Sequence, residues 1–129
     1  MRRFLLTCVA CWVLSACSNE FPDKDLSGSY VASYKGEIGT LSLKPDHSYV
    51  HVVRTRDRRI TEAEGSWRAV ATGPGQTAVE LPNFRGVPSY EVKSAGWVIE
   101  VDRTWLGRPH ICVDDDVGYC YVRRSEREG

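Results

Sequence analysis

The chain has 129 residues, a formal net charge of zero, and 42% hydrophobic and 26% charged residues. This length suits one small domain with a single core. The balanced charge provides no strong basic field, so we do not expect nucleic-acid binding.

The chain begins with the pattern of an export signal. Arg2 and Arg3 precede an uncharged, mostly apolar run over residues 4–14. This run of eleven residues is shorter than the about 20 that a membrane-spanning helix needs, and it fits the apolar region of a signal peptide. We therefore predict that residues 1–16 are removed.

The stretch Leu14-Ser15-Ala16-Cys17 resembles the lipobox of bacterial lipoproteins. The resemblance implies cleavage before Cys17 and acylation of this cysteine by fatty acids such as palmitate. In a Gram-negative organism, Ser18 in place of Asp after the cysteine also implies sorting to the outer membrane, on the side that faces the periplasm; in a Gram-positive organism this step has no meaning. The alternative is an ordinary secreted protein cut near the same place. Cys8 and Cys11 leave with the signal, so their C-x-x-C spacing has no role in the mature chain.

Removal of residues 1–16, which contain two arginines and no acids, changes the net charge from zero to about −2. Residues 17–26 are polar and contain one proline, which is typical of a lipid anchor followed by a short tether. We expect residues 27–129 to form the domain.

From residue 27 onward, apolar and polar residues alternate as in strands, and turn formers recur every eight to twelve residues or so. We expect strands at 27–34, 39–43, 48–56, 60–70 with a bend at Gly65, 77–81, 89–92 and 97–101, and a hairpin at 112–120. This spacing predicts an all-β fold, a small antiparallel meander closing into a barrel or sandwich.

The segments SGSYVASY, GTLSLKPDHSYVHV and EGSWRAV, within residues 27–70, resemble the opening of small lipocalin-like lipoprotein domains. The copper-resistance and envelope-stress lipoprotein barrels share this pattern. The resemblance implies a lipocalin-like barrel of about eight strands. The copper-resistance type also carries a metal-linked C-x-x-C, which has no counterpart in the mature chain, so we expect no metal and no cofactor.

Cys112 and Cys120 are the cysteines that remain beside Cys17. An even number in a small exported domain predicts a disulfide, here across a hairpin in which Val113 faces Tyr119. A thiolate metal site is the alternative, disfavoured because no further soft ligand lies near in the sequence.

The histidines give no clear metal site. His47 and His51 are four residues apart, which on a strand separates them by about 13 Å. His110 shares a face with the predicted disulfide, and we expect it to be packed or solvated.

Two charged runs have a functional and a simpler interpretation. Asp114, Asp115 and Asp116 could bind calcium or supply carboxylates, but no EF-hand spacing is present, and a charged hairpin tip is the simpler reading. Arg54–Arg59 holds four arginines that could bind an anionic partner, or pair across the turn with Glu62 and Glu64.

Three loops carry the candidate binding residues. Aromatic side chains beside arginine are typical of interface anchors, with a plug over the barrel end as the alternative. The candidates are Phe84 and Arg85 in loop 82–88, Trp105 and Arg108 in loop 102–108, and Asp114, Asp115 and Asp116 at the hairpin tip.

No G-x-S-x-G motif or free cysteine supports catalysis, so we do not expect an enzyme. We expect a lipid-anchored cell-envelope binding protein that acts as a protein-binding module, such as an inhibitor, immunity or assembly accessory lipoprotein. The alternative is a small-molecule carrier or sensor with a ligand in the barrel mouth. A filled interior would favour the first, and an open pocket the second.

Overall fold

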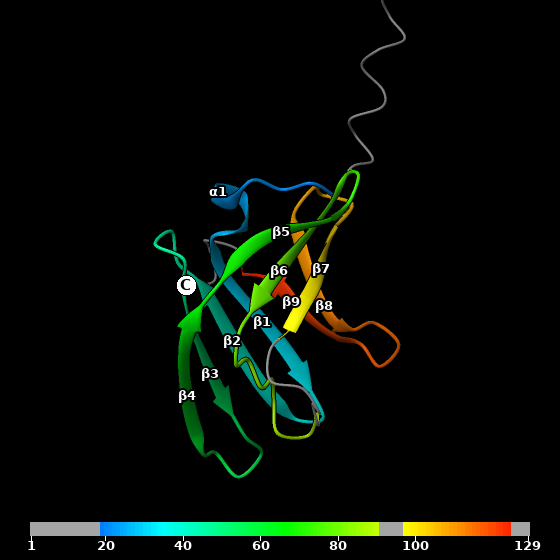
Figure 1. Cartoon of the computed structure of the whole chain (residues 1–129). Helices are drawn as coiled ribbons and strands as arrows, with labels where there is room; N and C mark the ends of the chain where they lie inside the picture. The colour runs from blue at the N-terminus through cyan, green and yellow to red at the C-terminus, as the bar shows by residue number, and fades with distance from the viewer. Residues whose placement is uncertain (1–18, 91–96, 125–129) are drawn as a thin grey trace, which may run out of the picture.

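A computed structural model describes residues 19–90 and 97–124 as one short helix and nine strands (Figure 1). All neighbouring strands are antiparallel, in the order β4-β3-β2-β1-β9-β8-β7-β6-β5. The all-β antiparallel meander is confirmed, with nine strands instead of about eight. The elements are α1 (Asp23–Leu26), β1 (Gly28–Tyr34), β2 (Glu37–Leu43), β3 (Ser48–Arg54), β4 (Ile60–Ser66), β5 (Arg68–Gly73), β6 (Gln76–Leu81), β7 (Trp97–Arg103), β8 (Pro109–Asp114) and β9 (Tyr119–Arg123).

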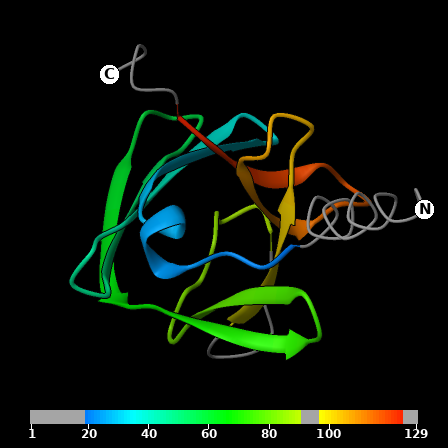
Figure 2. The same ribbon diagram turned by 90° about the horizontal axis from the view of Figure 1, so that it is seen from above.

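The sheet is strongly curled, and its two edge strands, β4 and β5, are connected end to end along the chain (Figure 2). They are consecutive, and Trp67 lies between them. The indole is 2% exposed, its Nε1 donates to the Lys44 carbonyl at 2.9 Å, and its backbone N donates to the His47 carbonyl at 2.8 Å. The expected single strand 60–70 is therefore two strands that separate at Trp67.

Gly65 is not the bend that the sequence suggested. It lies directly opposite Tyr49 in a regular register. A Cβ at Gly65 would lie 2.4 Å from Cε1 of Tyr49. The glycine therefore leaves room for a tyrosine ring to lie across the neighbouring strand.

The interior of the curled sheet is filled by large side chains. Alternation places every second residue inside, as in β2, where buried and half-buried residues alternate along the whole strand. Each of the following aromatic side chains is at most 9% exposed: Tyr30, Tyr49, Phe84, Trp97, Tyr119 and Tyr121. Their rings meet edge-on or tilted, as in the Phe84–Trp97 pair at 5.2 Å between centroids.

The segment expected to be a tether is packed against the barrel from residue 19 onward. Phe21 is 5% exposed and Leu26 is fully buried. The Phe21 backbone N donates to Oγ1 of Thr77 at 3.0 Å, and Asn19 forms a bridge with Gln76. Two apolar anchors in a polar stretch thus fix α1 over one end of the curled sheet (Figure 2).

Loop 82–90 also differs from expectation, because Ser89 and Tyr90 lie in turns and not in a strand. The predicted strand continued to residue 92, and residues 91 and 92 lie outside the described residues. Phe84 and Val87 insert into the core at 2% and 1% exposure. The loop therefore closes the end of the barrel opposite α1.

Within residues 19–90 and 97–124, no helix has both the length and the apolar character needed to cross a bilayer.

Candidate functional site

The antiparallel order divides the connections between two ends of the barrel (Figure 1). The α1 end carries Asn19, α1 and the turns 44–47, 74–75 and 104–108. The opposite end carries the turns 35–36, 55–59 and 115–118 together with loop 82–90. The predicted binding residues consequently do not form one site: Trp105 and Arg108 lie at the α1 end, whereas Arg85 and the three aspartates lie at the opposite end.

At the α1 end, the turn after β7 presents two apolar side chains to solvent. Trp105 is 91% exposed and Leu106 is 60% exposed. The turn is nevertheless well ordered by hydrogen bonds. The backbone N of Thr104 donates to the Arg108 carbonyl at 2.9 Å, and that of Gly107 donates to the Thr104 carbonyl at 2.8 Å. The arrangement holds an indole away from the core on a rigid support.

Arg103 joins this turn to the start of the domain. Its Nη1 donates to the Gly107 carbonyl at 3.0 Å, and its Nη2 donates to the Glu20 carbonyl at 3.2 Å. The guanidinium also lies over the Phe21 ring, 4.2 Å from the centroid. The exposed indole and the first described residues therefore belong to the same end of the molecule.

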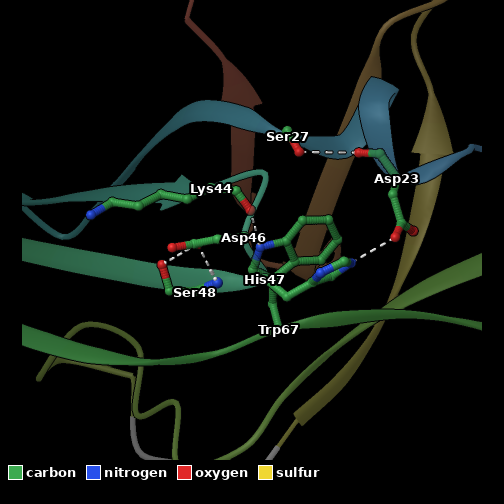
Figure 3. Close-up of polar contacts among 7 residues, drawn as sticks. All are labelled: Asp23, Ser27, Lys44, Asp46, His47, Ser48 and Trp67. Carbon is green, nitrogen blue, oxygen red and sulfur yellow. Dashed lines mark hydrogen bonds and ion pairs between the residues drawn. The ribbon is translucent and has the colours of Figure 1, made fainter.

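α1 is held in place by a polar cluster (Figure 3). His47, in the turn after β2, contacts Oδ2 of Asp23 through Nε2 at 2.7 Å and lies 5.0 Å from the Trp67 ring. Asp46 accepts hydrogen bonds from the backbone N and the hydroxyl of Ser48 at 3.0 and 2.6 Å, which lower the pKa of its carboxyl. These contacts make the α1 end a fixed surface.

The hairpin of β8 and β9 contains the disulfide that the sequence predicted. Cys112 and Cys120 lie directly opposite each other and are joined. Tyr119 pairs with Asp114 and not with Val113, because the register shifts between Cys112 and Asp114. The bulge is the reason why strict alternation fails at the end of this hairpin.

The three aspartates of this hairpin have different environments. Asp114 is half-buried, accepts a hydrogen bond from the Tyr90 hydroxyl at 2.9 Å, and accepts another from the Asp116 backbone N at 3.1 Å. Asp115 and Asp116 are exposed. Asp114 is therefore part of the support of the turn, whereas the other two carboxylates are accessible.

Phe84 is not accessible either. It is buried among Tyr49, His51, Trp97 and Tyr121. This corrects its assignment as a binding residue and supports the alternative, a plug. Its neighbour Arg85 remains exposed.

His110 lies on the face of the disulfide, as the sequence predicted, and contacts one of its cysteines. Its Nε2 is 3.5 Å from Sγ of Cys112. One ligand atom each from His110, Cys112 and Cys120 fits within 4.8 Å of the others. The signal was present, since a residue two before a strand cysteine shares its face.

His51 belongs to a buried chain of hydrogen bonds. Its Nε2 lies 2.7 Å from the Tyr121 hydroxyl, which lies 2.7 Å from the Tyr119 hydroxyl. The Tyr119 hydroxyl accepts from the Val87 backbone N at 3.2 Å. Burial lowers the pKa of His51 to about 4 and raises the pKa of Tyr121. A neutral imidazole sealed in the core therefore has a structural role here.

No arginine of residues 54–59 lies directly opposite an acid of β4 in the register. Glu62 lies opposite Val52, and Glu64 opposite Val50. Arg59 pairs instead with Asp57 at 3.0 Å, within its own turn. The expected pairing across the turn is thus replaced by a local one.

Comparisons with protein-family models, with curated proteins and with solved structures give no match.

Proposed function

We propose that this protein is a lipid-anchored cell-envelope binding protein that holds a protein partner at the end opposite α1. The observation that carries the proposal is the division of the exposed candidate binding residues between two ends. Trp105 and Arg108 lie with the start of the domain, whereas Arg85, Asp115 and Asp116 are exposed at the other end.

The short distance from the lipobox supports an orientation on the membrane. Asn19 is fixed to Gln76 and to the Gly75 carbonyl, and Cys17 precedes it by two residues. An acyl chain on Cys17 would hold the α1 end against the bilayer. Trp105 and Leu106 would then meet the interface, where tryptophan is favoured.

The opposite end would face the aqueous space. It offers Arg85 on loop 82–90 and Asp115, Asp116 and the 51% exposed Val117 on the β8–β9 turn. The disulfide and the Tyr90–Asp114 hydrogen bond fix this turn. Rigid loops on a stable scaffold are a common way to bind a protein.

The filled interior favours a protein partner over a small ligand. Six large aromatic side chains are buried there, and Phe84 and Val87 from loop 82–90 close the mouth. A carrier would need this loop to leave the core, which exposes both side chains to water.

The test is affinity capture from cell-envelope extracts with the oxidised domain, residues 18–129, and identification by mass spectrometry. We expect one stoichiometric protein, captured by wild type and lost with D115N/D116N. The variant E62Q/E64Q removes the same charge from β4 and should retain it. A small molecule that copurifies in place of a protein would establish the carrier instead.

A further inference from the structure

We propose that the β8–β9 hairpin, when its disulfide is reduced, binds one zinc ion through Cys112, Cys120 and His110, with Asp115 as the fourth ligand. This site does not involve the lipid anchor, but it shares Asp115 and the hairpin with the surface proposed to bind a partner, whose test uses the oxidised protein.

The spacing of the nitrogen and sulfur atoms fits tetrahedral zinc. Zinc binds thiolate sulfur at about 2.3 Å and imidazole nitrogen at about 2.0–2.1 Å, so two such ligands lie about 3.5 Å apart. The distance from Nε2 of His110 to Sγ of Cys112 is 3.5 Å. After the disulfide is opened, the two sulfurs can move apart to about the 3.5 Å that separates two ligands of one zinc ion.

A carboxylate completes the set. Oδ1 of Asp115 lies 3.9 Å from Sγ of Cys112 and 4.0 Å from Sγ of Cys120. Asp116, one residue further, has no such contact with sulfur among the described residues. Two thiolates, one imidazole and one carboxylate are ligand types that zinc accepts in proteins.

The hairpin holds these groups in place without help from the sulfur–sulfur bond. Ile111, Tyr119 and Tyr121 are fully buried on its other face, and His110 pairs with Val122 in the ladder. The ligand face itself is half-buried, so an ion has access from solvent. Reduction would therefore leave a preformed site.

The redox step requires a dithiol reductant. Each reductant molecule transfers two electrons and two protons to the disulfide, giving the Cys112 and Cys120 thiols and the cyclic disulfide of the reductant. Zinc binding then releases both thiol protons to water, and His110 binds as the neutral ring. An oxidant that reforms the disulfide would expel the ion.

The test uses the full chain with Cys8, Cys11 and Cys17 replaced by serine, so that the hairpin holds its only cysteines. Reduced and oxidised protein are titrated with Co²⁺, and Zn²⁺ is measured by competition with a chromophoric chelator. We expect one Co²⁺ per reduced chain, with thiolate charge-transfer absorption and a tetrahedral d–d spectrum that Zn²⁺ abolishes. The oxidised chain should show neither the charge-transfer absorption nor the tetrahedral d–d spectrum.

Variants separate the ligands from their surroundings. H110N and D115N should each weaken Zn²⁺ binding, H110N by more than the about 10- to 100-fold typical of a lost outer-shell group. D116N is the matched control and should bind as wild type does. Near-UV circular dichroism confirms that each reduced variant keeps its fold.

Equal Zn²⁺ affinity of the reduced and oxidised chains would overturn the proposal, and this comparison needs no substitution. Unchanged affinity in H110N would also overturn it, because the site would then be a simple pair of thiolates.

Discussion

His51 shows how strongly the core of this small barrel acts on one side chain. The ring is 4% exposed and faces the Tyr121 hydroxyl and the Phe84 ring. Burial disfavours the charged form, which lowers the pKa of His51 from 6.5 to about 4. The raised pKa of Tyr121 keeps that hydroxyl neutral as well.

This pKa predicts a loss of stability in mild acid. Between about pH 6.5 and pH 4 the unfolded chain binds a proton on His51 and the folded chain does not, so the free energy of unfolding falls as the pH falls. The full effect is about 3 kcal/mol. Urea unfolding at a series of pH values should show this slope in wild type and a smaller slope in H51Q. Parallel pH profiles of the two proteins would contradict the assignment.

The environments of single side chains were also the hardest feature to predict from the sequence. Phe84 stands between asparagine and arginine in a loop, and its burial depends on the barrel mouth into which it folds. Gly65 was interpreted as a bend, but a glycine is needed there because the Tyr49 ring on the adjacent strand occupies the space of a Cβ. Both depend on contacts between segments far apart in the chain, which local patterns do not contain.

Among the elements, the turn between β7 and β8 is unusual because it exposes two large apolar side chains to solvent. Trp105 and Leu106 are exposed side by side on a hydrogen-bonded turn, and Arg108 is exposed beside them. Amphipathic aromatic and basic side chains of this kind favour the membrane interface. The proposed anchor at Cys17 would bring the turn to that depth.

We predict that this turn binds membranes even without the lipid. Residues 18–129 mixed with vesicles of zwitterionic and anionic phospholipid should show a blue shift of tryptophan emission from Trp105, because Trp67 and Trp97 are already 2% and 9% exposed. W105A should lose the shift and sediment less with vesicles. V117A, at the opposite end, is the matched control and should behave as wild type does. Equal sedimentation of wild type and W105A would exclude the contact.

At the element scale the sequence performed well where the signal is local. Alternation located the cores of β1, β2, β3, β6 and β7, and the cysteine count together with the expected export predicted the disulfide. It failed for residues 19–26, because Phe21 and Leu26 are two apolar residues in a stretch whose average is polar. The separation of β4 from β5 at Trp67 depends on sheet closure, which no local pattern encodes.

At the largest scale, the described residues form a curled, barrel-like sheet with two unlike ends. The α1 end is rigid, carries the exposed indole and lies two residues from Cys17. The opposite end exposes Arg85, Asp115 and Asp116, and loop 82–90 closes it. The sequence contained every one of these residues but could not assign them to ends, since that assignment follows from strand order. An anchored protein with this polarity would present one end to the membrane and the other to a partner.

The most direct test of this account is the intact mass of the mature protein purified from membranes, together with peptide mapping of its N-terminus. The account predicts a chain that begins at Cys17 and carries fatty acyl groups, and a C17S variant that stays unprocessed and unacylated. An unmodified chain, or a mature N-terminus at another residue, would contradict the lipid anchor and the orientation derived from it.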